Sequence, residues 1–161
     1  LDQFIDKKIY LPSGYIYKGE KLLLTHPSNN TIYEQFAGNY NEFFGKLSPS
    51  TITLMLNPES DYDCIFNNIQ FKSELYIDDI DQPDKTLTHI QAYNEYQNSG
   101  KIPLEVGRGK NIRRKFREWK ADIPRQGRER IRNTWIFLKL EYNNDRNGKL
   151  ILHDIILSYT L

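Results

Sequence analysis

The side chains that most often carry catalytic chemistry near neutral pH are few in this sequence and stand far apart. The chain has three histidines, His26, His89 and His153, and one cysteine, Cys64. None of the histidines begins a spacing typical of metal ligands, and a single cysteine excludes an internal disulfide and a multi-cysteine zinc site. His153 precedes an aspartate within an apolar stretch, and we interpret the two as an ordinary half-buried pair. We expect Cys64 to be a packed thiol, because apolar residues follow it directly.

The sequence also lacks the short motifs that mark common catalytic sites. It contains no G-x-S-x-G motif, no phosphate-binding loop and no dinucleotide fingerprint. Two acidic runs, residues 61–63 and 78–84, offer oxygen atoms of the kind that calcium prefers, but neither has the spacing of a known calcium loop. We therefore predict a chain that is not an enzyme and that holds no metal or cofactor.

A basic segment, residues 108–132, is the strongest charge feature of the chain. It holds 11 of the 22 Lys and Arg residues but only three of the 21 Asp and Glu residues. Its net charge is therefore +8, against −7 for the rest of the chain. Such an uneven distribution indicates a partner of opposite charge or a pairing within the chain.

Several kinds of contact fit this segment. Its cations could neutralise nucleic-acid phosphates while Phe116 and Trp119 stack on bases. They could instead face the acidic stretch of residues 59–84, which carries eight carboxylates and one lysine, or an acidic patch of a partner subunit. We favour these two contacts over nucleic acid. Carbohydrate is a further alternative, since sugar rings stack on exposed Trp119 or Trp135, although packing in the core or against a subunit explains both residues as well.

The elements that must position these residues are predicted to be strands. The chain has 11 Tyr and 8 Phe but only three Ala, a composition that suits pleated sheets better than helices. A β-hairpin is expected within residues 8–24, and a long loop pinned by aromatic rings, with one short helical turn at most, within residues 26–50. Alternating or β-branched runs predict further strands at residues 51–56, 64–77, 87–96, 135–142 and 149–161.

The last two predicted strands flank a turn-rich segment, residues 143–148, so the clearest local prediction is a terminal antiparallel hairpin. Together the runs predict an all-β, mainly antiparallel fold, a β-sandwich or a jelly roll, with long loops and at most minor helix.

The length of 161 residues suits a single β domain, in which residues 1–50 pack on the sheet of residues 51–161. No apolar run reaches the roughly 20 residues that cross a bilayer. The chain begins with a leucine and shows no signal peptide, so we expect it to be the C-terminal part of a longer polypeptide.

A series of short segments resembles the C-terminal domain of crAss-like bacteriophage tail proteins. In order, these are residues 38–45, 66–69, 73–74, 90–100, 113–119, 123–125, 130–133 and 152–156. The likeness covers roughly residues 36–161 and rests on the order and number of the segments. The family includes the muzzle protein at the tail tip and virion-stabilisation proteins. The resemblance implies a structural virion component without catalytic residues, located in the phage tail and assembled in the host cytoplasm.

On that resemblance, the basic segment is a candidate contact with a neighbouring subunit or another tail component. Repeated subunits gain from opposite charges on their two flanks, so the expected partners are other virion proteins and further copies of the chain. A receptor- or glycan-binding module is the alternative, nucleic-acid binding through residues 108–132 is less favoured, and membrane insertion is not expected. We assign the contact to apolar anchors and charged clamps, namely Phe116, Trp119, Arg113, Arg114, Arg117 and Arg125.

Overall fold

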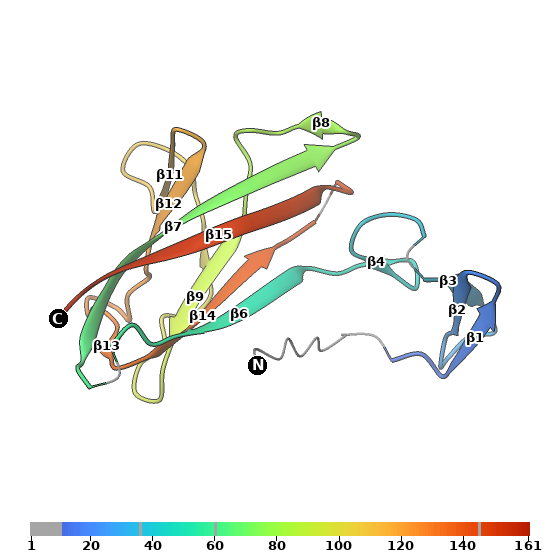
Figure 1. Cartoon of the computed structure of the whole chain (residues 1–161), viewed down its shortest axis with the longest axis horizontal. Coiled ribbons are helices and arrows are strands. Elements are labelled where there is room, and N and C mark those ends of the chain that lie inside the picture. The colour runs from blue at the N-terminus through green and yellow to red at the C-terminus, as the bar shows by residue number, and fades with distance from the viewer. Residues whose placement is uncertain (1–10, 36, 60, 145) are drawn as a thin grey trace. The chain divides into compact units, whose positions relative to one another are not determined.

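The computed structural model describes residues 11–35, 37–59, 61–144 and 146–161, which form two compact units, Leu1–Ser48 and Pro49–Leu161. Every regular element in these described residues is a strand, which confirms the predicted all-β class (Figure 1). Consequently, the described part of the chain contains no helix with the length and apolarity that a membrane crossing requires. The packing of residues 1–50 on the later sheet stays a prediction.

The first unit is built from short strands. β1 (Gly14–Lys18), β2 (Lys21–Thr25) and β3 (Ile32–Glu34) form an antiparallel sheet in that order, and β4 (Glu42–Phe43) pairs with β5 (Lys46–Leu47). β1 and β2 confirm a hairpin, although the strand expected at residues 8–11 lies mainly outside the described residues. The rings of His26 and Tyr33 lie 4.8 and 4.9 Å from that of Phe44, so aromatic contacts support the predicted loop, which also contains β3, β4 and β5.

The second unit consists of two antiparallel sheets around one core. The first sheet has the order β10-β9-β14-β6. Its strands are β10 (Ile102–Pro103), β9 (His89–Tyr93), β14 (Ile136–Tyr142) and β6 (Ser50–Leu56). Ile136, Leu138 and Leu140 alternate along β14 and are fully buried, so this face of the sheet covers the core.

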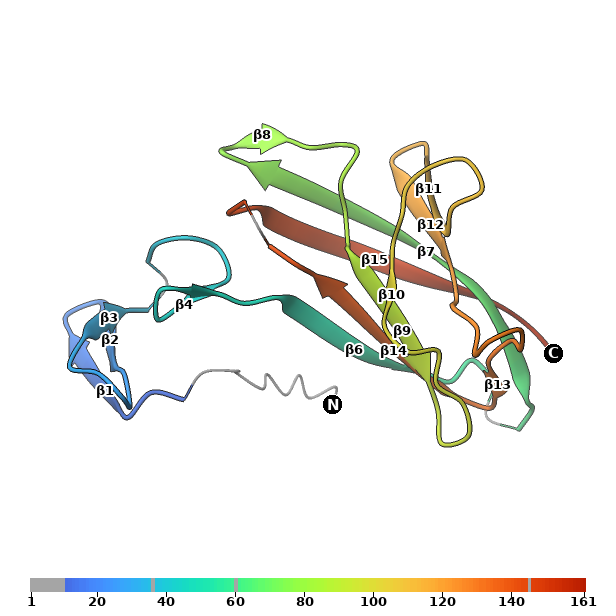
Figure 2. The ribbon, with the colours of Figure 1, turned by 180° about the vertical axis from the view of Figure 1, so that it is seen from behind.

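The second sheet is organised around β7 (Cys64–Ile77). β15 (Lys149–Thr160) pairs along most of one edge of β7. Because that edge is occupied, the other edge pairs in succession with three short strands, β13 (Arg132–Asn133), β12 (Glu118–Asp122) and β8 (Ile80–Asp81). β11 (Ile112–Lys115) pairs with β12. The β7–β8 and β11–β12 hairpins thus share one edge of β7, and Figures 1 and 2 show both on the same side of that strand.

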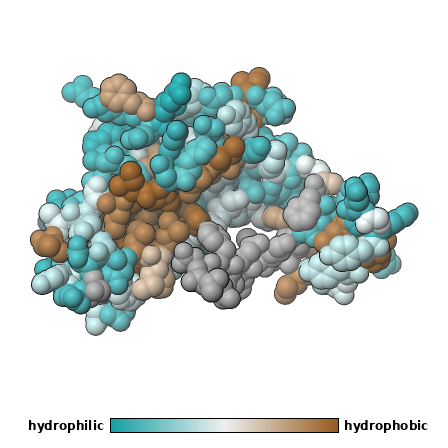
Figure 3. Space-filling model, viewed as in Figure 1, coloured by the Kyte–Doolittle hydropathy of each residue, from teal (hydrophilic) through white to brown (hydrophobic). Residues whose placement is uncertain are grey.

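The core of the second unit is formed by apolar residues of both sheets. Phe66, Ile69, Phe71 and Leu75 of β7 and Trp119 of β12 are among its fully buried members. Toward the edge strands the covering is incomplete, and apolar residues of β6 and β15 are only partly buried. Figure 3 shows the resulting apolar surface over β15, β14 and β6. The arrangement is an open, curled sandwich.

The predicted terminal hairpin is wrong, although both of its strands exist. β14 pairs with β6 and β9, whereas β15 pairs with β7, so these consecutive strands belong to different sheets. Buried Asn144 fixes this change of sheet, because its Oδ1 accepts the Gly148 N–H at 2.7 Å and its Nδ2 donates to the Gly148 carbonyl at 3.0 Å. A Cβ on Gly148 would collide with Tyr142 and Leu75, so the change of sheet also requires glycine.

Candidate interaction surface

The β11–β12 hairpin lies in the middle of the basic segment. Ile112, Trp119 and Ala121 are buried and anchor the hairpin in the core, while β12 is also paired with residues 68–71 of β7. The end of the hairpin is exposed, and we call its five residues the basic tip: Arg113, Arg114, Lys115, Phe116 and Arg117. The base of the β11–β12 hairpin is therefore buried in the core, and its cationic end is exposed to solvent.

The basic tip turns through two residues, Phe116 and Arg117. Lys115 and Glu118 pair on either side, and φ is 51° at Phe116 and 69° at Arg117. This is the type I′ geometry, in which Asn, Asp and Gly are favoured. A bulky residue with positive φ is strained, and the Phe116 side chain is also 88% exposed. The chain thus holds an apolar ring in solvent on a turn that a polar Asn-Gly pair would fit better.

The cations of the basic tip lie on the same hairpin end as this ring and take part in none of the ion pairs among the described residues. Lys115 Nζ lies 5.4 Å from the centroid of the Phe116 ring, and the Arg114 guanidinium lies 5.8 Å from that of Trp119. None of the ion pairs formed among the described residues includes a cation of the basic tip, or joins the basic segment to residues 59–84. Positive charge around an apolar ring suits an acidic protein surface with an apolar contact point.

The structure brings four of the six predicted contact residues together. Arg113, Arg114, Phe116 and Arg117 lie on the basic tip. Trp119 is only 1% exposed, because its ring fills the core, so it does not offer the surface anchor expected from the sequence. Arg125 is exposed but lies beyond the end of β12, which runs away from the basic tip.

Sequence reasoning missed the hairpin that carries these residues. The usual signal for a type I′ turn is Asn-Gly or Asp-Gly, and Phe116-Arg117 contains neither. The period-two spacing of Trp119, Ala121 and Ile123, all buried, is the signal that could have located β12.

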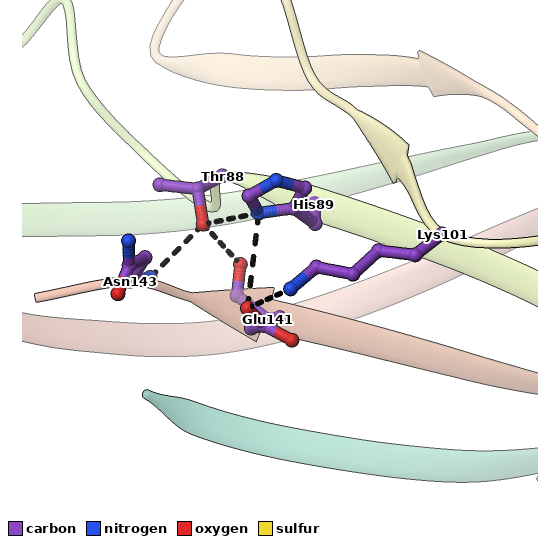
Figure 4. A network of polar contacts seen from close by, with 5 residues as sticks. All are labelled: Thr88, His89, Lys101, Glu141 and Asn143. Atoms are coloured by element: carbon purple, nitrogen blue, oxygen red, sulfur yellow. Dashed lines mark hydrogen bonds and ion pairs between the residues drawn. The ribbon is translucent and has the colours of Figure 1, made fainter. Parts of the chain in front are cut away.

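A polar cluster on the first sheet of the second unit is shown in Figure 4. The Glu141 carboxylate is largely buried and accepts a hydrogen bond from Lys101 Nζ at 2.6 Å. His89 Nδ1 lies 3.8 Å from the same carboxylate oxygen and 3.0 Å from Thr88 Oγ1. Thr88 Oγ1 donates to the Glu141 carbonyl and accepts from the Asn143 N–H. These contacts balance a buried charge and join neighbouring segments, which accounts for the cluster without a ligand.

The other candidate chemical groups are held in structural contacts. Burial and, to a lesser extent, two nearby carboxylates raise the pKa of the Cys64 thiol. His153 Nε2 lies 3.5 Å from Glu74 Oε1, while Asp154 Oδ1 accepts the Lys72 N–H at 3.1 Å and so does not orient the imidazole. Within the described residues, no three His, Cys, Asp or Glu side chains converge as metal ligands would.

Of the two tryptophans considered for sugar binding, Trp135 alone reaches the surface. It is half-buried, and its ring centroid lies 5.1 Å from that of Phe137, which in turn lies 5.3 Å from Tyr93. Phe137 alternates with the buried residues of β14, so this aromatic cluster lies on the outer face of the first sheet.

Comparison with known proteins places the chain in a family. A family model described as the Crassvirus muzzle protein C-terminal domain matches residues 38–126. The chain belongs to this family. It is also 40% identical over 133 residues to the muzzle protein of Bacteroides phage crAss001, which covers 80% of this chain and 10% of that protein. The resemblance to crAss-like tail proteins is thereby confirmed, and the muzzle-family match includes the whole β11–β12 hairpin. The chain spans about a tenth of the curated relative's length.

Proposed function

We propose that this chain is a structural, non-enzymatic domain of a phage tail and that its basic tip binds a neighbouring virion protein. The muzzle family supports a place in the virion. The observation that carries the contact is Phe116, an 88% exposed ring on a strained turn amid cations without ion pairs in the described chain. A partner that covers the ring and neutralises the charges would lower the free energy of such a surface.

The use of the candidate chemical groups supports the non-enzymatic part of the proposal. The Glu141 carboxylate is engaged by Lys101, and the Cys64 thiol is buried with a pKa raised above its ordinary value. An activated nucleophile needs a lowered pKa or an adjacent base, and the surroundings of Cys64 have the opposite effect.

Lysine footprinting of intact virions tests the contact. Lys115 lies on the basic tip, and Lys149, at the start of β15, is a second exposed lysine of the same unit. Mass spectrometry of purified virions first establishes whether peptides of this chain are present. We then expect acetylation of Lys115, relative to Lys149, to fall well below its value in the isolated 161-residue chain. An unchanged ratio in virions that contain the chain would contradict the contact.

Glycan binding is a second candidate function, favoured by the aromatic cluster of Trp135, Phe137 and Tyr93 on the outer face of the first sheet. Half-exposed rings of this kind can stack on sugar faces. A glycan array probed with the whole chain, and with Trp135→Ala as its matched variant, tests this function. Binding by the wild-type chain that is lost in Trp135→Ala would support glycan binding. An array without signal for the wild-type chain would contradict it.

A further inference from the structure

The β7–β8 hairpin ends in a second projecting turn, which has the opposite charge. Ile77 pairs with Ile80, and Asp78 and Asp79 between them have φ of 51° and 61°, again the type I′ geometry. We call residues 78–81 together with Asp84 the acidic tip. Its four carboxylates form none of the ion pairs found among the described residues, and the Ile80 side chain is 65% exposed.

The basic and acidic tips match each other in charge and in polarity. The basic tip contains four cations and exposed Phe116, and the acidic tip contains four carboxylates and exposed Ile80. Each tip therefore combines an exposed apolar residue with charges of a single sign, and the two tips have opposite signs. A surface that fits either tip is thus present elsewhere on the same chain.

Both tips are carried by the same edge of β7. β12 pairs with β7 up to Phe71 and β8 pairs from Tyr76 onward, so the attachment points are on the order of 17 Å apart along the strand. Figures 1 and 2 show both hairpins rising from the same side of β7 without meeting. A two-fold axis across this edge would reverse the direction of β7 in a second copy. Each basic tip would then face the acidic tip of the other copy.

We propose that two copies of this chain pair reciprocally, the basic tip of each docking on the acidic tip of the other, with Phe116 covering Ile80. This inference rests on the proposed function and names the partner as a second copy. Charge complementarity carries it, because one chain provides both halves of the contact. Two-fold pairing also uses both tips at once and leaves neither set of charges without a counterpart.

A charge-swap experiment on the whole chain tests this pairing. One variant exchanges two charges of the basic tip (Arg113→Glu with Arg117→Glu), and the other exchanges two charges of the acidic tip (Asp81→Lys with Asp84→Lys), so that each altered tip has no net charge. All four side chains are exposed and outside the core, so both variants should fold, which circular dichroism and urea unfolding verify. Arg128→Glu with Arg132→Glu changes two exposed cations near the start of β7, where Arg132 pairs with Ile65, and is the matched control away from both tips.

Light scattering as a function of concentration and salt measures the association. We expect the wild-type chain to form a dimer that weakens as salt rises. Each tip variant alone should associate about tenfold more weakly or worse, because each exchange acts at both contacts. The control should behave as wild type. An equimolar mixture of the two tip variants should recover association, because one contact of the mixed dimer joins two unaltered tips and the other joins exchanged charges of opposite sign.

A mixture that associates no better than its components overturns the reciprocal pairing, as does a wild-type chain that stays monomeric at about 1 mM in low salt. Assemblies that keep growing with concentration overturn the two-fold arrangement. The failure of self-pairing is distinguishable from that of the proposed function. In the former case Lys115 is still protected in virions, by a different partner, whereas in the latter it is not.

Discussion

Replacing Phe116 and Arg117 by Asn and Gly should stabilise the chain and weaken its association at the same time. A non-glycine residue in the left-handed region costs roughly 1–2 kcal/mol, and both turn positions lie there. Asn relieves part of this cost and Gly most of it, although Gly loses about 0.5–1 kcal/mol more entropy on folding. The exposed Phe116 ring has little packing to lose. We expect a net gain of about 1–2 kcal/mol in the free energy of unfolding.

Urea unfolding followed by tryptophan fluorescence measures this gain. Both tryptophans, Trp119 and Trp135, belong to the second unit, so the signal reports the unit that carries the turn. For a slope of about 2 kcal/mol per molar urea, the midpoint should rise by about 0.5–1 M with the slope unchanged. Lys115 protection in virions and dimer formation in solution should both decrease, because the apolar ring and one cation of the basic tip are gone.

The β7–β8 turn provides an internal comparison for this prediction. It has the same backbone geometry, but its residues are Asp78 and Asp79, and aspartate tolerates positive φ better than phenylalanine does. Asp78→Asn with Asp79→Gly should therefore raise the urea midpoint less. A midpoint that is unchanged or lower in the Phe116→Asn, Arg117→Gly variant would refute the strain argument. A stabilised variant that associates as well as wild type would show that Phe116 is not part of the contact.

Three further substitutions or treatments test the packing of the second unit. Trp119→Ala should lower the free energy of unfolding by about 3–5 kcal/mol in the urea experiment, since it leaves a cavity in the core; a loss below about 1 kcal/mol would contradict the assigned burial. Asn144→Ala leaves the N–H and carbonyl of Gly148 without their partner and should cost about 2–4 kcal/mol, whereas exposed Asn143→Ala should change stability little. The raised pKa of Cys64 means less thiolate at a given pH, so iodoacetamide at about pH 8 should label the unfolded chain much faster than the native one, and equal rates would refute this.

Alternation in the sequence predicts much of the second unit. The runs at residues 64–77 and 135–142 correspond to β7 and β14, because one face of each is buried and burial selects apolar residues at every second position, with one change of phase in β7 between Phe66 and Ile69. Alternation does not predict which strands pair with one another. β14 and β15 are neighbours in sequence with a turn-rich segment between them, which is the usual pattern of a hairpin. Their separation depends on the long edge of β7 and on Asn144 folding inward, and both are non-local features.

The candidate surface was predictable in its charge but not in its shape. Eleven cations in residues 108–132 are visible in the sequence, whereas the exposure of Phe116 and the burial of Trp119 are not. The two rings are three positions apart, so the face that each occupies depends on where the chain turns between them. Phe116-Arg117 lacks turn chemistry, and the turn therefore escapes detection. A residue pair that violates local preference at an exposed tip is typical of a functional site rather than of a folding requirement.

The strength of the proposed pairing follows from its small size. An exposed ion pair contributes about 0.2–1 kcal/mol, and two reciprocal tips contain only a few such pairs and two apolar contacts. Association of free chains loses about 4 kcal/mol or more in translational and rotational freedom, so the isolated domain should pair weakly. Copies held beside one another in a larger assembly meet at effective concentrations in the millimolar range, where weak contacts are populated. The 161-residue chain fused to a dimeric scaffold should accordingly show the tip-to-tip contact at far lower concentration than the free chain. If the fusion brings no such gain while the charge-swap mixture still pairs, the tips are joined in a geometry that two adjacent copies cannot reach.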